Sequence, residues 1–186
     1  MILGTIVANN ANVPVKFVLS LLQVTKYHVV IHEGASIPHN RNAVFERARL
    51  EGESLLFIDS DIVFTLSDVK KIEKHLETKD VISGVYVMGF PGFPPAIFDS
   101  KFHVKEPEVS LFEIGASGAG FLGISSKVIQ TLTEPFTPRP GPNGRYYGED
   151  ISFAMNAKDA GFSLFCDPTI KVGHIKPQTK YYQSPL

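Results

Sequence analysis

The sequence predicts an α/β fold with a mostly parallel central sheet, flanked by helices and accompanied by a small antiparallel sheet. Two observations support this class. Strand-like and helical patterns alternate through the first half of the 186 residues, an order typical of parallel sheets. The second half carries short strand-like segments between Gly and Pro, which favours antiparallel pairing. No repeat or low-complexity tract divides the chain, so we expect residues 1–186 to form one domain.

The first half reads as four strands separated by three helices. The expected strands are rich in Ile, Val and Leu and span residues 2–8, 28–31, 55–58 and 81–87. A first helix over 14–23 has Pro14 in its first turn, where proline is tolerated. A second helix over 42–50 places Val44, Phe45 and Ala48 on one face. Thr65 and Asp68 form a capping-box pattern ahead of the third helix.

The second half is more irregular. Short β segments are expected near 96–98, 102–104 and 111–114, then a strand over 121–124 and a helix over 126–132. The run 137–144 is so rich in Pro and Gly that a mobile loop is expected there. A helix over 148–160 ends at Gly161, and late strands follow over 163–166 and 169–172.

Composition excludes some functions. With 18 basic and 19 acidic residues, the chain has no net field that would recruit nucleic acid or an anionic membrane. The single Cys166 cannot form an internal disulfide, which fits a reducing compartment. No basic region precedes the first apolar run, and no run is long enough to span a bilayer. We therefore expect a soluble cytoplasmic protein without a transmembrane segment.

The most informative segment is Asp59-Ser60-Asp61, which directly follows the apolar run 55–58. Four apolar residues followed by acids indicate a buried strand that emerges at its carboxyl end, where open α/β sheets bind ligands. Two carboxylates there suit Mg²⁺ or Mn²⁺, and such a cation suits a diphosphate. A turn-capping role for either aspartate is the alternative.

Other chemistry-bearing residues occur in small groups, each with a structural alternative. Glu149 and Asp150 begin a helix, where acids are also favoured by the helix dipole. His174 follows a strand, and a single histidine is more often structural than a ligand. The glycine-rich run 115–121 either admits a bulky ligand or forms a flexible turn. Arg41, expected to open a helix, could meet a phosphate or a base, or be solvated.

The order of these groups resembles that of the GT-A fold glycosyltransferases, above all glycosyltransferase family 2 and its relatives. The resemblance covers nearly the whole chain. The motifs that carry it are, in chain order, Arg41-Asn42, Asp59-Ser60-Asp61, Ser117–Phe121, Gly148–Phe153, Asp167-Pro168 and Gly173-His174. It implies transfer of a sugar from a nucleotide-diphosphate sugar to an acceptor hydroxyl, with Mn²⁺ or Mg²⁺ as cofactor and an unknown carbohydrate, protein or lipid acceptor.

The resemblance also implies a role for each candidate residue. The nucleotide and donor sugar would be held by Ala8, Asn9, Asn10, Arg41, Asp59, Ser60, Gly118 and Gly120. Asp61 and His174 would bind the metal. Asp150, or else Glu149, would be the base that activates the acceptor, which favours inversion. The chain lacks Trp, so aromatic contacts to an acceptor would come from Tyr146, Tyr147, Phe90 and Phe93.

Three other functions remain open at this stage. The segment 55–63 also matches the motif of haloacid dehalogenase-type phosphatases, in which Asp59 would be a nucleophile. That motif normally opens the chain, whereas two strands and two helices precede it here. A nucleotidyltransferase would need a glycine-rich, basic loop after the first strand, which the sequence lacks. The third alternative is a sugar-nucleotide binding module without catalysis.

Overall fold

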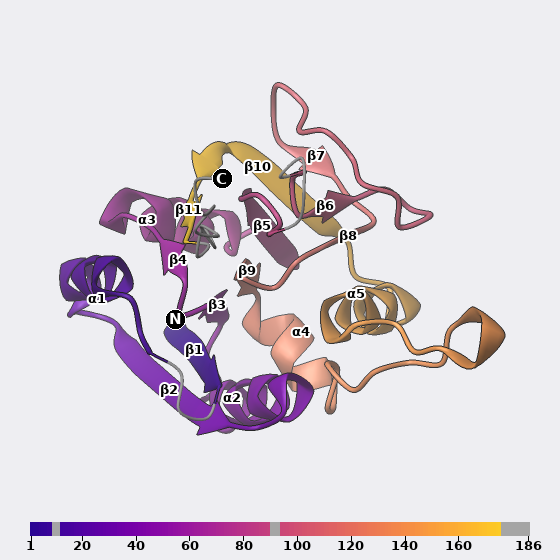
Figure 1. The fold of residues 1–186 in the computed structure, drawn as a ribbon, viewed down its shortest axis with the longest axis horizontal. Helices are drawn as coiled ribbons and strands as arrows, with labels where there is room; N and C mark the ends of the chain where they lie inside the picture. The colour runs from indigo at the N-terminus through magenta and orange to yellow at the C-terminus, as the bar shows by residue number, and fades with distance from the viewer. Residues whose placement is uncertain (9–11, 90–93, 176–186) are drawn as a thin grey trace, which may run out of the picture.

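The structure is a computed structural model that describes residues 1–8, 12–89 and 94–175. Its centre is a seven-stranded sheet in the order β2-β1-β3-β9-β5-β10-β7 (Figure 1). The bounds are β1 Ile2–Ala8, β2 His28–Gly34, β3 Leu55–Ile58, β5 Val81–Val85, β7 Phe112–Glu113, β9 Phe121–Ile124 and β10 Leu164–Lys171. All strands except β9 and β7 run in one direction. The predicted α/β class with a mostly parallel sheet is confirmed.

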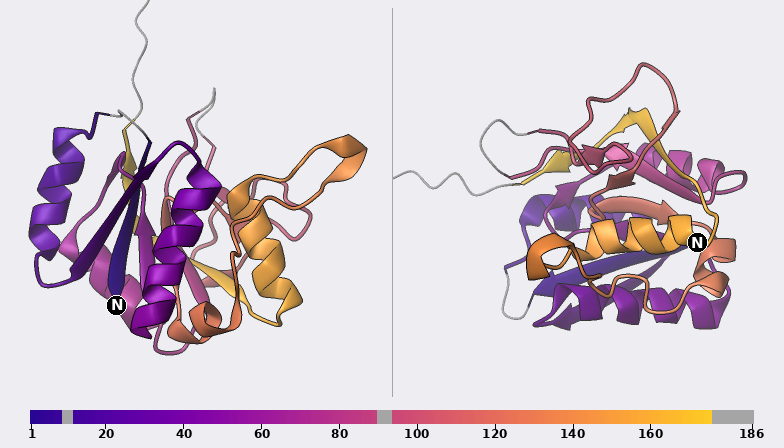
Figure 2. Two further views of the ribbon diagram at one scale, coloured as in Figure 1. Left: turned by 90° about the horizontal axis from the view of Figure 1, so that it is seen from below. Right: turned by 90° about the vertical axis from the view of Figure 1, so that its right-hand side faces the viewer.

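Helices cover both faces of this sheet (Figures 1 and 2). They are α1 Val15–Leu21, α2 Ile37–Glu51, α3 Leu66–His75, α4 Ser126–Thr131 and α5 Glu149–Asp159, with short 3-10 turns η1 Leu22–Val24 and η2 Pro142–Gly144. Buried residues of α2, α4 and α5 form one apolar cluster, and those of α1 and α3 form the other. The alternation along β3 fits this arrangement, since Leu55 and Phe57 belong to the first cluster and Leu56 and Ile58 to the second.

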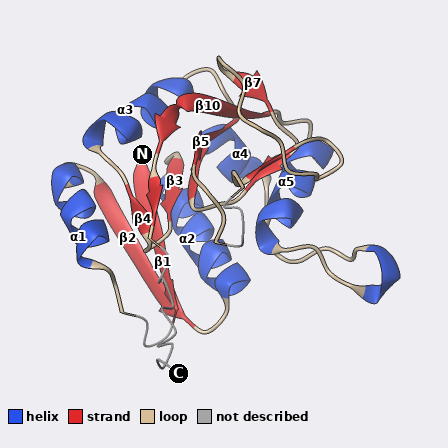
Figure 3. Ribbon diagram, turned by 45° about the horizontal axis from the view of Figure 1, so that its top comes forward, coloured by secondary structure: helices blue, strands red, loops and turns tan. Residues whose placement is uncertain are grey.

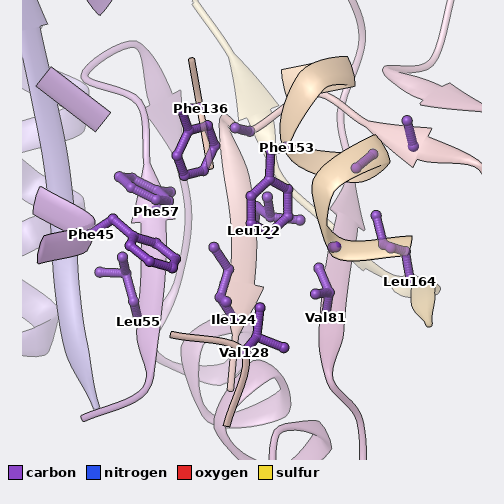
Figure 4. Close-up of a cluster of buried hydrophobic side chains, with 14 of the residues drawn as sticks. Phe45, Leu55, Phe57, Val81, Leu122, Ile124, Val128, Phe136, Phe153 and Leu164 are labelled. Atoms are coloured by element: carbon purple, nitrogen blue, oxygen red, sulfur yellow. The ribbon is translucent and has the colours of Figure 1, made fainter. Parts of the chain in front are cut away.

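Aromatic packing fixes the position of α5 against the sheet (Figure 4). Phe136 stacks on Phe153 of α5 with ring centroids 4.7 Å apart, and its edge meets Phe57 of β3 at 5.1 Å. All three side chains are almost fully buried. Such pairs add to the free energy gained by burial alone. The start of α5 is thereby held close to the end of β3.

The predicted start of the second helix is wrong. α2 begins at Ile37, not at residue 42, with Pro38 in its first turn, where proline lacks only a hydrogen bond that the helix does not need. Arg41 therefore lies within the helix and does not open it.

The predicted capping box before α3 is confirmed, because the Thr65 hydroxyl accepts the Asp68 amide hydrogen and the Asp68 carboxylate accepts the Thr65 amide hydrogen.

Two predictions for the second half also need correction. The run 137–147 is not devoid of regular structure. It forms a projecting arm that includes η2, and its two sides pair through Pro140 and Tyr146.

The two predicted late strands are one strand, β10, with a register shift between Cys166 and Lys171. Pro168 has no amide hydrogen to donate, and the Asp167 carboxylate accepts the Thr169 amide hydrogen at 2.8 Å, so the strand bulges there without ending.

The remaining strands form two small antiparallel sheets beside the carboxyl edge of the main sheet, with the four strands labelled in Figure 1 and the strands coloured red in Figure 3. β4 (Ile62–Val63) pairs with β11 (Gly173–His174), and β6 (Ile97–Phe98) pairs with β8 (Ala116–Ser117). The first pair brings residue 174 beside residue 62, far away in sequence. No helix among the described residues is both long and apolar enough to cross a bilayer.

Candidate functional site

A cleft of about 170 Å³ lies at the carboxyl ends of β1 and β3, where open α/β sheets bind ligands. Its lining is Ile6, Ala8, Ile37, Asn40, Arg41, Asp59, Ser60 and Asp61. Four predicted nucleotide or donor residues (Ala8, Arg41, Asp59, Ser60) and one predicted metal ligand (Asp61) thus share one cavity. Asn9 and Asn10, also predicted to hold the nucleotide, lie outside the described residues, as do Phe90 and Phe93.

Arg41 lines this cleft, and its side chain is almost fully buried. One guanidinium nitrogen, Nη2, donates to both carboxylate oxygens of Asp59, at 2.9 and 3.2 Å. Nε donates to Glu149 Oε1 at 3.5 Å, and Nη1 to the Ala119 carbonyl at 3.4 Å. Burial alone would lower the pKa of Arg41, but the charges of Asp59 and Glu149 outweigh it and raise the pKa. Arg41 is therefore a buried cation that joins α2 to β3 and α5.

Asp61 and His174 meet at the rim of the cleft. The pairing of β4 with β11 brings His174 Nε2 to 3.1 Å from Asp61 Oδ2, although the two residues are 113 positions apart. The other ring nitrogen, Nδ1, is 2.6 Å from the Val87 carbonyl oxygen. Because a carbonyl can only accept, Nδ1 must carry a proton. The protonated ring donates Nε2–H to Asp61, whereas in the neutral ring Nε2 carries a lone pair and is the form that could bind a cation together with Asp61.

This arrangement fits a divalent cation. Histidines that bind metals usually donate their second ring N–H to a carbonyl or carboxylate, as His174 does to Val87. Within residues 1–8, 12–89 and 94–175, no group of three or more His, Cys, Asp or Glu side chains is placed to hold a metal. Among the described residues, Asp61 and His174 form the pair that could hold a cation, and a bound diphosphate or water could supply further oxygen donors.

Charge at the site favours a cation as well. The guanidinium of Arg41 forms ion pairs with the carboxylates of Asp59 and Glu149. It also interacts electrostatically with the carboxylate of Asp150. Asp61 adds another carboxylate at the same cleft. Among the described residues of the site, negative charge therefore exceeds positive charge, and a divalent ion bridging to an anionic ligand would relieve the repulsion.

The two acids at the start of α5 have different surroundings, although both were predicted as catalytic candidates. Glu149 is engaged by Arg41. Asp150 accepts the Ile151 amide hydrogen at 2.8 Å and makes no ion pair with a described residue. Burial, and then the charge of Glu149, raise the pKa of Asp150 above its usual value. A carboxylate with a raised pKa is a better proton acceptor near neutral pH.

The predicted donor-sugar glycines contact a residue that sequence reasoning missed. A side chain on Gly118 would place its Cβ 2.1 Å from the Tyr86 hydroxyl, and one on Gly120 would approach the same ring at 2.9 Å. The Tyr86 hydroxyl accepts the Gly120 amide hydrogen at 3.0 Å. These glycines are thus needed for packing against Tyr86, and neither lines the cleft. Their contact with a donor sugar stays a prediction.

Tyr86 also connects the glycine-rich segment with the proposed metal ligand His174. Its ring meets that of His174 edge to face, with centroids 5.4 Å apart. Burial, and then the charge of Asp59, raise the pKa of its hydroxyl, so the phenol stays protonated and can act as a hydrogen-bond donor. From the sequence, a tyrosine at the end of a strand is most simply interpreted as a core residue. Only the spacing of Gly118 and Gly120, which lie against its ring, could have indicated its role.

Asn40 is a second residue that the prediction did not assign to the site. Its Nδ2 donates to the Gly34 carbonyl at 3.0 Å, while its buried Oδ1 finds no partner among the described residues. Asn40 lines the cleft beside Arg41. The neighbouring Asn42 is structural, because its Oδ1 accepts the Phe136 amide hydrogen at 2.9 Å and so anchors the base of the arm.

Comparisons with known proteins support the fold. No protein-family model and no curated protein sequence matches the chain. Among solved structures, A197 from STIV is similar with a TM-score of 0.72 and 20% identity, over 95% of this chain and 86% of that one. GalNAc-T7, solved with UDP, GalNAc and Mn²⁺, is similar with a TM-score of 0.59 and 11% identity.

The second similarity covers 94% of this chain but only 43% of GalNAc-T7. This chain therefore spans less than half of that protein. At these identities the similarity shows the fold alone. The fold is of the GT-A type, as the order of motifs implied, and its carboxyl edge carries the cleft described above.

Proposed function

We propose that the chain is a metal-dependent glycosyltransferase that moves a sugar from a nucleotide-diphosphate sugar to an acceptor hydroxyl, with inversion. The observation that carries the proposal is the Asp61–His174 pair, whose ring orientation is fixed by the Val87 carbonyl. It lies at the rim of a cleft on a GT-A fold whose solved relative GalNAc-T7 contains UDP and Mn²⁺. Residues 1–186 would form the single transferase domain.

Each residue has a defined part in this proposal. Asp61 and His174 would hold Mn²⁺ or Mg²⁺, which, when bound, supplies charge neutralisation for the diphosphate leaving group. Ala8, Ser60 and Asn40 would line the nucleotide, with Asn9 and Asn10 as further candidates. Arg41 would orient Asp59 from behind. Asp150 would accept the proton of the acceptor hydroxyl as that oxygen attacks the anomeric carbon.

The phosphatase alternative has less support. A haloacid dehalogenase-type reaction needs Asp59 as a free nucleophile. Arg41 instead donates to both of its carboxylate oxygens, which lowers their nucleophilicity. The fold similarity also points to the GT-A class. A binding module without catalysis would share the cleft, and only a measurement of turnover separates it from a transferase.

The test is metal-linked nucleotide binding. A ligand that binds only the folded state stabilises it by about 2.7 kcal/mol at a hundredfold excess over its dissociation constant. UDP or GDP should therefore raise the melting temperature in the presence of Mn²⁺ and much less with a chelator. Asp61→Asn and His174→Ala should each remove most of the Mn²⁺-dependent shift, and the double variant should lose little more, because both side chains act through one ion.

Glu113→Gln is the matched control, since Glu113 is an exposed carboxylate on the remote edge strand β7. It should behave as the wild type. Shifts of equal size with Mn²⁺ and with chelator, across a panel of nucleotides, would refute the metal bridge. Nucleotide binding without sugar transfer or sugar-nucleotide hydrolysis would instead favour the binding module.

A further inference from the structure

Helix α1 is apolar on the side that faces away from the protein. Its inner side packs Phe17 and Ser20 into the core. Its outer side carries Val15, Val18 and Leu19, and Leu22 of η1 continues the same side. We call these four residues the α1 face, and their exposed fractions are 73%, 42%, 56% and 63%. The spacing of these four residues places them on one stripe opposite the buried side. A surface helix normally presents polar residues there, so this face is suited to contact something apolar.

The position of α1 leaves this face open. The helix lies at the periphery of the molecule, beyond the edge of the sheet formed by β2 (Figures 1 and 2). Isolated exposed aliphatic residues are common on protein surfaces, but a contiguous stripe marks an interaction site.

Charge identifies the class of partner. Residues 12–32 contain Lys16 and Lys26 and no Asp or Glu. A cleft of about 250 Å³ adjoins the end of the stripe, and its lining includes Lys26 and Lys70 with Thr25 and Gln23 but no carboxylate. An apolar stripe flanked by lysines is typical of helices that lie in the interface of an anionic bilayer. A second copy packed face to face would bring these lysines together, and their repulsion disfavours a symmetric dimer.

We propose that the α1 face docks the protein on the surface of an anionic membrane, with the aliphatic side chains in the acyl boundary and Lys16, Lys26 and Lys70 against lipid phosphates. The near-zero net charge of the whole chain does not oppose this, because Lys26 and Lys70 line one cleft beside the face. The proposal is independent of the proposed glycosyltransferase activity, and its test needs no sugar nucleotide.

The test is co-sedimentation with vesicles of phosphatidylcholine alone and of phosphatidylcholine mixed with phosphatidylglycerol. The wild type should bind the anionic vesicles, and added salt should weaken binding by screening the lysines. The Leu19→Gln/Leu22→Gln double variant should bind at least about tenfold more weakly, because two aliphatic side chains no longer enter the interface. Lys16→Gln/Lys26→Gln should lose about tenfold on anionic vesicles only.

Leu50→Gln/Val109→Gln is the matched control. These residues are 72% and 98% exposed and lie outside the α1 face, so this variant should bind as the wild type does. The thermal stability of each variant verifies folding. Equal binding by the α1 and control variants would overturn the proposal, as would absence of vesicle binding. A dimer in solution that the Leu19/Leu22 variant dissociates would also overturn it, because a second copy would then cover the face.

Discussion

At the scale of single residues, Asp150 is distinguished from Glu149 by its surroundings. Both begin α5, but Glu149 is held by the buried Arg41, whereas Asp150 has a pKa raised by burial and by its neighbour. If Asp150 is the base, Asp150→Asn should keep the Mn²⁺-dependent nucleotide shift while turnover falls by about 10²–10⁴-fold. Steady-state kinetics with a sugar nucleotide measures this. Near wild-type turnover would reject the role and favour Glu149 or a retaining mechanism.

The raised pKa of Asp150 also leads us to expect that stability depends on pH. A folded-state pKa raised above the unfolded value contributes stability that is fully present below the unfolded pKa and is lost as pH rises through the folded pKa. Asp150→Asn cannot ionise, so it should gain thermal stability relative to wild type as pH rises from about 3 to about 8. Melting temperatures of both proteins across this range test it. A constant difference would show that the pKa of Asp150 is not raised.

At the scale of elements, apolar periodicity predicts the parts of the fold that bury apolar faces. The strand that ends before Asp59, the capped helix α3 and the helix that begins with Glu149 occur where the sequence places them. The first turn of α2 was missed because its buried residues, Asn40 and Arg41, are polar. Their burial depends on Gly34, Asp59 and Glu149, which are partners that no local pattern reveals.

The residues of the candidate site likewise fall into those that a local sequence pattern reveals and those that only the tertiary structure brings together. The acids at 59, 61, 149 and 150 are recognisable because they directly follow a strand or begin a helix. The contact between Asp61 and His174 depends on the pairing of β4 with β11, two strands too short for a sequence pattern to match. The resemblance to a family suggested that contact, and the residues themselves did not. Tyr86 was not predicted, because its role follows from packing against two distant glycines, whose spacing was the one signal in the sequence.

At the scale of the whole molecule, the sheet collects these side chains at one edge. The parallel strands β1, β3, β5 and β10 all end on the side where α5 begins and where β11 returns to β4 (Figure 2, left). Aromatic residues behind that edge, Phe57, Phe136 and Phe153, hold α5 in place. The base candidate therefore depends on this aromatic cluster, whereas Ile62 and Val172, beside the metal candidates, belong to the second apolar cluster on the other face of the sheet.

Arg41 links the aromatic cluster to the site. Its substitution distinguishes a structural role, as a buried ion-pair partner of Asp59 and Glu149, from direct binding of the nucleotide. Removing one partner of a buried ion pair leaves uncompensated charge, at a cost of about 3–5 kcal/mol in buried settings. The carboxylates of Asp59 and Glu149 remain partly exposed, so Arg41→Met should lower the free energy of unfolding by about 3 kcal/mol, and Arg41→Lys by less. Urea unfolding measures both.

Arg49→Met is the matched control on the same helix. Its partner Glu46 lies at the surface, where ion pairs contribute little, so stability should hardly change. If Arg41 instead binds the nucleotide directly, Arg41→Met should leave unfolding unchanged and abolish the Mn²⁺-dependent nucleotide shift. Because Arg41 is almost fully buried and donates to Asp59, Glu149 and the Ala119 carbonyl, we expect the loss of stability, with weaker nucleotide binding following from a displaced Asp59.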